Sequence, residues 1–147
     1  MRLLTRFVVP VLIASLALPT TVAIASDGHH ASSSERADYS LSLKVDRVKA
    51  STGQVKFTVT PKGFTYVKVS DAGAPNVAGE GHAHIYAKDT DTGKVRYIGW
   101  TGNGLTDWSL PGRLKPGKTY RIYAIFSEND HTELRRIRSR AVTVTMS

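Results

Sequence analysis

Cysteine is absent from this chain of 147 residues, and methionine occurs only twice. The lack of cysteine excludes disulfides, a cysteine nucleophile and a lipid anchor on an N-terminal cysteine. The scarcity of methionine argues against a thioether-rich site for Cu(I). The fold therefore has to rest on its apolar core, which about 110 residues can supply in a single domain.

Recognisable catalytic motifs are missing as well. The sequence has no Gly-x-Ser-x-Gly nucleophile motif, no glycine-rich phosphate loop and no convincing pair of carboxylates. It also lacks a long segment of helical periodicity and an internal repeat. These absences predict a binding protein rather than an enzyme.

The first 25 residues have the pattern of an export signal. Arg2 and Arg6 form a positive start, residues 7–18 form an apolar stretch, and Ala23-Ile24-Ala25 is a small-residue cleavage site. The apolar stretch is short for a membrane span, which needs about 20 residues. We predict cleavage, a periplasmic or secreted protein, and no integral membrane segment in the mature chain.

Removal of Arg2 and Arg6 with the signal leaves 18 basic and 12 acidic residues, a formal charge of +6. An excess of this size attracts anionic surfaces weakly and is not the footprint of a nucleic-acid-binding protein. No nucleic-acid partner is therefore expected.

Residues 26–38 are polar, rich in serine and histidine, and read as a flexible leader. His29 and His30 are most simply solvated tail residues. An accessory metal site there depends on the cleavage point. Cleavage after Ser26 would expose Asp27-Gly28-His29, whose nitrogens can surround Cu(II) or Ni(II) in a square plane. Cleavage after Ala25, which we favour, would spoil that geometry.

Short alternating segments from residue 39 to residue 147 predict a single all-β domain of about seven antiparallel strands. Their even spacing favours an immunoglobulin-like β-sandwich. The stretch Leu114-x-Pro116-Gly117-x-x-Tyr120 resembles the turn into the sixth strand of fibronectin type III domains, where the tyrosine caps a corner. On that alignment residues 81–88 form the third strand, residues 120–126 the sixth and residues 137–144 the last.

The third strand, Gly81-His82-Ala83-His84-Ile85-Tyr86-Ala87-Lys88, alternates strictly. Small and aliphatic side chains are expected to face the core: Ala83, Ile85 and Ala87. Polar and aromatic side chains are expected on the solvent side: His82, His84, Tyr86 and Lys88. Because the third and sixth strands of this topology are antiparallel neighbours, His131, just beyond the sixth strand, should lie near His82 and His84.

Three converging imidazoles predict a metal site formed by His82, His84 and His131. Nearby carboxylates are candidates for a fourth ligand or for orienting the histidines: Glu80, Glu128, Asp130 and Glu133. Copper, as Cu(II), is the first expectation from the Irving–Williams order, and zinc is the second. The alternative is that the three histidines lie on a polar sheet face by chance.

Two motifs resemble those of a family of small exported β-sandwich proteins associated with metal, chiefly copper, handling. They are Gly81-His82-Ala83-His84-Ile85-Tyr86 and Asn129-Asp130-His131. The resemblance implies a metal-binding role for His82, His84 and His131. Because no catalytic set accompanies these histidines, the sequence predicts a carrier or a sensor in metal homeostasis, with a metal-delivery or membrane protein as its expected partner.

A different class of function stays open. Trp100, Trp108 and the turn Gly102-Asn103-Gly104 could form the surface of a protein- or carbohydrate-binding module, such as an immunoglobulin-like inhibitor, without any metal. Tryptophan is more often half-buried in a sandwich, and no specific motif supports this surface.

Overall fold

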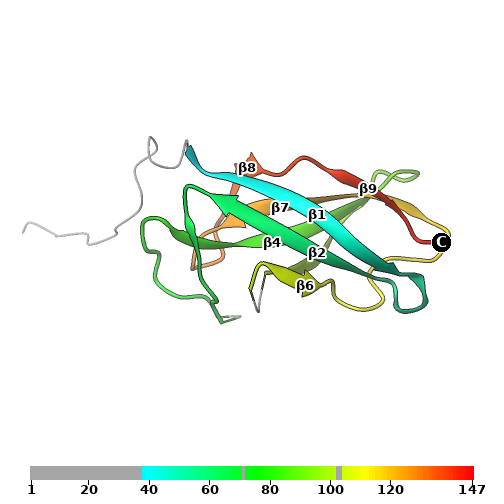
Figure 1. Ribbon diagram of the computed structural model, residues 1–147, viewed down its shortest axis with the longest axis horizontal. Helices are drawn as coiled ribbons and strands as arrows, with labels where there is room; N and C mark the ends of the chain where they lie inside the picture. Colours follow the sequence, from blue (N-terminus) through cyan, green and yellow to red (C-terminus); the bar gives the residue numbers. More distant parts are fainter. Residues whose placement is uncertain (1–37, 71, 102–103) are drawn as a thin grey trace, which may run out of the picture.

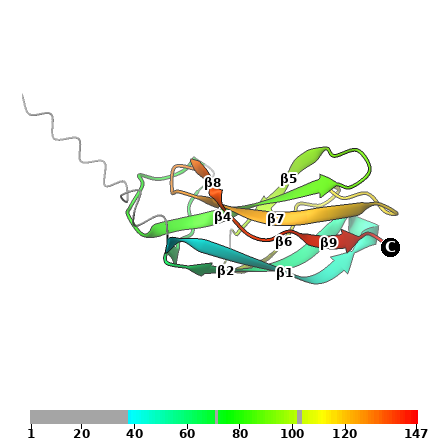
Figure 2. The same ribbon diagram turned by 90° about the horizontal axis from the view of Figure 1, so that it is seen from above.

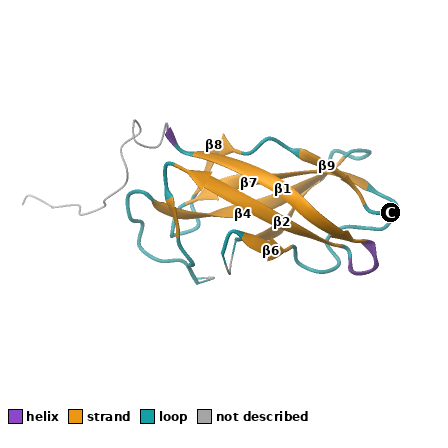
Figure 3. Ribbon diagram, in the orientation of Figure 1, coloured by secondary structure: helices purple, strands orange, loops and turns teal. Residues whose placement is uncertain are grey.

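The computed structural model describes residues 38–70, 72–101 and 104–147, and within these ranges its regular secondary structure is almost entirely strand, joined by turns and loops (Figure 1, Figure 3). The strands are β1 (Ser40–Lys49), β2 (Gln54–Lys62), β3 (Thr65–Tyr66), β4 (Glu80–Asp89), β5 (Val95–Trp100), β6 (Thr106–Trp108), β7 (Thr119–Ser127), β8 (Glu133–Arg138) and β9 (Val142–Thr145). No helix in these ranges is long and apolar enough to span a bilayer. The predicted signal peptide and the tail histidines, His29 and His30, lie outside the described residues.

Two sheets form the layers of a sandwich, which Figure 2 shows edge-on. The smaller sheet has the order β1-β2-β6, and the larger sheet has β4 and β7 at its centre. In the larger sheet β5 pairs with β4, and both β8 and β9 pair with β7. The predicted all-β sandwich is confirmed.

The described residues contain nine strands instead of about seven, for two local reasons. The predicted last strand is divided into β8 and β9 at Ser139. There the Ser139 backbone N–H donates to Ala124 O (3.0 Å), and the Ser139 Oγ accepts from Ala124 N (2.9 Å). Ser139 therefore forms hydrogen bonds with both backbone groups of Ala124 in β7 at the break between β8 and β9. The second addition is β3, whose two residues pair with β4 in parallel rather than antiparallel.

The core lies between the two sheets and confirms the predicted alternation. Ala83, Ile85 and Ala87 of β4 are all buried, and they pack with apolar residues of β2 and β7 in one cluster. Tyr120 is also fully buried, and its hydroxyl accepts a hydrogen bond of 3.0 Å from the backbone N–H of Lys115. The predicted tyrosine-capped corner is therefore present.

The pairing of β4 with β7 determines where the predicted site residues lie. The two strands are antiparallel and in continuous register from His82 opposite Ser127 to Asp89 opposite Tyr120. The first residues of β4 therefore lie beside the last residues of β7, as the sandwich topology predicts.

Replacing Ile85 by alanine tests this packing. Ile85 has an exposed fraction of 0%, so Ile85→Ala should lower the free energy of unfolding by roughly 2–5 kcal/mol because a cavity remains in the core. Lys88→Ala, at an exposed position of the same strand, is the matched control and should change it by no more than about 0.5 kcal/mol. Urea denaturation of both variants measures the difference. Equal losses would show that the strand faces have been assigned wrongly.

Candidate metal centre

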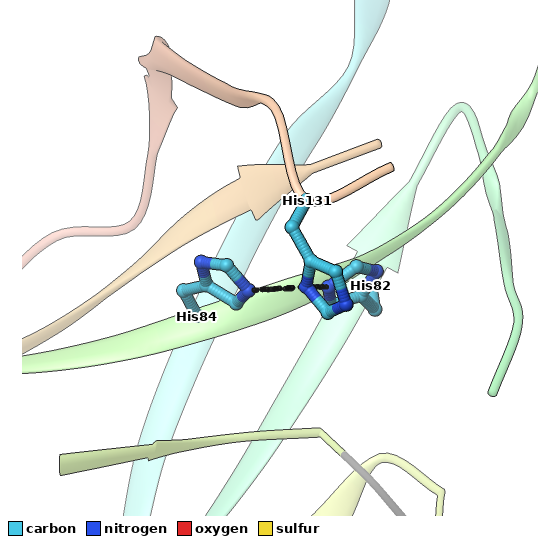
Figure 4. Close-up of side chains that lie close together, drawn as sticks. All are labelled: His82, His84 and His131. Carbon is cyan, nitrogen blue, oxygen red and sulfur yellow. Dashed lines mark hydrogen bonds between the residues drawn. The ribbon is translucent and has the colours of Figure 1, made fainter. Parts of the chain in front are cut away.

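Three imidazoles meet at the end of the sandwich where β4 begins and β7 ends. The Nε2 atom of His82 lies 3.2 Å from Nε2 of His84 and 3.1 Å from Nδ1 of His131. The third side of this triangle, from His84 Nε2 to His131 Nδ1, is 3.2 Å. Figure 4 shows His131 reaching from the loop after β7 toward the two histidines of β4. The fold brings together the three residues that the sequence singled out.

His82 and His84 owe their position to the strand period and to the glycine that precedes them. Residues two apart on a strand point to the same side, which brings the two rings together. Gly81 cannot be replaced without a shift, because a Cβ atom there would overlap the ring of Phe126 and lie 2.7 Å from Ser127 O. Its missing side chain lets the start of β4 lie against β7.

His131 is held in a tight turn rather than on a strand. Its backbone φ is 68°, a left-handed conformation that is uncommon for residues other than glycine. The turn is closed by hydrogen bonds from His131 N to Glu128 O and from Glu128 N to Thr132 O, both 3.0 Å long. The Asp130 carboxylate accepts a further bond of 2.8 Å from Thr132 N. The turn therefore holds the backbone of His131 in one place.

The segment that precedes β4 forms hydrogen bonds with this turn. The backbone carbonyl of Ser70 lies 2.9 Å from Nε2 of His131. Two other bonds join the same two segments: Ala74 N to Asn129 O (2.8 Å) and Asp130 N to Asn76 Oδ1 (2.9 Å). A further bond, from Asn129 Nδ2 to Glu80 Oε2 (3.1 Å), joins the turn to the first residue of β4. The ring of His131 is thus oriented by a contact 61 residues away in the sequence.

Glu133 orients His84 in the same way. Its Oε1 atom accepts a hydrogen bond of 2.8 Å from Nδ1 of His84 and another of 2.5 Å from the hydroxyl of Tyr86. A carboxylate that binds the far nitrogen of an imidazole fixes the ring and raises the basicity of the other nitrogen. Glu133, one of the four carboxylates predicted as candidates, therefore forms a hydrogen bond to a site histidine.

The other three carboxylates have different surroundings. The group of close ligand atoms in the described ranges contains histidine nitrogens alone. Glu80 accepts from Asn129, Asp130 accepts from the backbone of its own turn, and Glu128 is buried, with an exposed fraction of 8%. A ligand or orienting role for Glu80, Glu128 and Asp130 stays a prediction.

Aromatic rings enclose the histidines, and this corrects the expected exposure. His82 was expected on the solvent side, yet its exposed fraction is 0%. The Trp100 ring lies edge-on to His82 at 5.5 Å between centroids and 5.9 Å from His131, and Tyr97 lies 5.5 Å from His84. Trp100 is opposite His84 in the β4–β5 pairing. The register of that hairpin was the signal that could have assigned Trp100 to the site.

Burial keeps the two strand histidines neutral at pH 7. Desolvation, with a smaller contribution from the neighbouring His84 and His131, lowers the pKa of His82 to about 3. Desolvation also lowers the pKa of His84 and outweighs the opposing effect of Glu133. Burial and the contact with Glu133 raise the pKa of Tyr86, so its hydroxyl remains a donor. The two rings therefore present lone pairs instead of positive charge.

The partners of the outer nitrogens decide which inner nitrogens carry those lone pairs. A carboxylate and a backbone carbonyl can only accept, so His84 holds its proton on Nδ1 and His131 holds its proton on Nε2. When both rings are neutral, the inner nitrogens, His84 Nε2 and His131 Nδ1, are bare and face each other. On His82, Nδ1 is buried and has no hydrogen-bond partner among the described residues. Its Nε2 is directed at both bare nitrogens.

The depressed pKa of His82 predicts a pH-dependent stability of the metal-free protein. Its ordinary pKa of about 6.5 applies to the unfolded chain, which therefore binds more protons than the folded state below that pH. The free energy of unfolding should fall as the pH falls, by about 2 kcal/mol between pH 7.5 and pH 5 from His82 alone. Urea denaturation at the two pH values measures this loss. His82→Leu should show a smaller loss, and an equal loss in both proteins would contradict the assignment.

Comparisons with known proteins find no relative of this chain. The chain matches no protein-family model, no curated protein and no solved structure. What the site can do is therefore inferred from its own geometry: the three facing imidazole nitrogens lie 3.1–3.2 Å from one another, close enough for one metal ion to bind all three.

Proposed function

We propose that the protein is an exported metal-binding protein that holds one copper or zinc ion through His82, His84 and His131. The contact between His84 Nε2 and His131 Nδ1 carries this proposal. The two atoms are 3.2 Å apart, and in neutral rings both carry a lone pair, because the ring proton then lies on the outer nitrogen that donates to Glu133 or to Ser70 O. Two lone pairs at that distance repel each other, and a cation between them and His82 turns the repulsion into coordination.

The neutrality of the site supports the same function. Metal binding to imidazole competes with protons, and the pKa values of His82 and His84 are already lowered by burial. His82 can move its single proton to Nδ1 and offer Nε2 to the ion without changing its charge. A cation can therefore bind without first displacing a proton charge from His82 or His84.

A carrier or homeostatic role agrees with the number of ligands. Three protein nitrogens leave a position for an exchangeable donor, which a delivery protein or a membrane partner protein could supply. The predicted signal peptide supports a periplasmic or secreted location for this exchange. We propose binding and transfer rather than catalysis, because the sequence carries no recognisable catalytic motif and Glu133, the carboxylate beside His84, is engaged with His84 and Tyr86.

The alternative of a protein- or carbohydrate-binding surface has weaker support. It requires Trp100 to present its ring outward, whereas Trp100 is half-buried and its ring packs against His82 and His131. Gly102 and Asn103 of that surface lie outside the described residues.

The ligands themselves provide the main test. His84→Ala and His131→Ala should each weaken Cu(II) or Zn(II) binding by more than the roughly 10–100-fold typical of an outer residue, because each removes one ligand. Calorimetric titration of the mature chain should give a stoichiometry of about one. The control is the double substitution His29→Ala, His30→Ala, which should leave this site intact. If the control loses all binding while His131→Ala does not, the function belongs to the tail.

Glu133 provides a finer test. Glu133→Gln should lower metal affinity by about 10–100-fold while all three ligands remain, because an amide no longer polarises Nδ1 of His84. Glu80→Gln is the matched control, since Glu80 bonds to Asn129 and to no ligand. Titration under the same conditions compares the two. An effect of Glu80→Gln as large as that of Glu133→Gln would argue against orientation through His84.

A further inference from the structure

The triangle formed by His82 Nε2, His84 Nε2 and His131 Nδ1 indicates which coordination geometry a bound ion can adopt. Its three sides are 3.2, 3.1 and 3.2 Å, so the nitrogens form a nearly equilateral triangle. Metal–imidazole bonds are about 2.0–2.1 Å long. An ion that binds all three nitrogens at this length must sit above the plane of the triangle, with equal angles to the three ligands.

Different coordination geometries require different triangles. Three ligands of a tetrahedral ion lie about 3.3 Å from one another, close to the observed sides. Three ligands of a square-planar ion include one trans pair about 4.0 Å apart and two adjacent pairs about 2.9 Å apart. The observed triangle has neither a side near 4.0 Å nor sides near 2.9 Å, as a square-planar ion would require. Three facial ligands of an octahedral ion, whose metal–nitrogen bonds are longer, lie about 3.0–3.1 Å apart, so the space around the triangle has to distinguish this geometry from a tetrahedral one.

The surroundings of the triangle also favour a low coordination number. An octahedral ion would need three further ligands, yet the rings of Trp100 and Tyr97 pack against all three imidazoles. No carboxylate oxygen joins the group of ligand atoms in the described ranges. One exogenous donor is sufficient to complete a tetrahedron.

From this geometry we infer that the cargo is a d10 ion in tetrahedral coordination, Cu(I) or Zn(II), rather than tetragonal Cu(II). Such ions have no ligand-field preference that would oppose the equilateral triangle. The inference rests on the proposed metal-binding function and narrows it. It also departs from the expectation of Cu(II) that the divalent affinity order suggests.

Cobalt substitution tests the geometry independently of affinity. Tetrahedral Co(II) absorbs visible light strongly and octahedral Co(II) absorbs weakly, so the spectrum reports coordination directly. The mature chain carrying His29→Ala and His30→Ala should bind one Co(II) with an intense visible band. His84→Ala and His131→Gly should abolish the band, and glycine is suited to the left-handed conformation at residue 131, so the second variant should remain folded. Zn(II) in air and Cu(I) under anaerobic, reducing conditions should each displace the Co(II).

The outcomes separate the two proposals. Stoichiometric Co(II) binding that needs the three histidines but gives a weak band would overturn the tetrahedral inference and leave the metal-binding function standing. Failure to bind Co(II), Zn(II), Cu(I) and Cu(II) alike, in a folded protein, would overturn both. Displacement by Zn(II) alone or by Cu(I) alone would identify which d10 ion the site takes.

Discussion

The antiparallel pairing of β4 with β7 is the constraint on which the rest of this structure depends. It joins the middle of the chain to its last third, in register from His82 opposite Ser127 to Asp89 opposite Tyr120. The same pairing buries the inner faces of both strands and brings the loop after β7 to the first histidines of β4. A slip of one residue would turn the histidines toward the core and Ile85 toward the outer face. Fold and site are therefore specified by one register.

At its first residues the polar side of β4 is enclosed by neighbouring side chains, and imidazole rings occupy this enclosed space. His82 is fully buried, Trp100 and Tyr97 pack against the imidazoles, and Glu133 and Ser70 bind the outer nitrogens of the other two rings. Burying polar rings costs free energy unless their hydrogen bonds are made. Here the outer nitrogens of His84 and His131 are satisfied, and the inner ones are directed at each other. An arrangement of this kind is costly as a purely structural device and is suited to binding a cation.

Much of the fold can be read from local sequence patterns. The alternation from Gly81 to Lys88 determines which face of β4 enters the core, because side chains alternate along any strand. The leucine, proline, glycine and tyrosine between Leu114 and Tyr120 determine the corner, because the tyrosine hydroxyl meets the backbone only five residues away. His131 could be placed near His82 and His84 because the sandwich topology follows from the order of the strands. The alternation and the corner depend on short-range geometry, which the sequence determines by itself, whereas the position of His131 depends on the pairing of β4 with β7 that the sandwich topology requires.

The tertiary structure decided what depends on contacts between distant segments. The left-handed turn at His131 and its bond to Ser70 join residues 61 apart, and no periodicity predicts them. The choice of Glu133 over Glu80, Glu128 and Asp130 as the partner of His84 depends on the direction of β8 as it leaves the turn. The burial of His82, which lowers its pKa, depends on the rings of Trp100 and His131 closing over a strand face that alternation alone assigns to solvent. The sequence determined that His82, His84 and His131 meet. Only the tertiary structure decided which residues surround them and how their rings are oriented, because the direction of a side chain is set by neighbours from other parts of the chain.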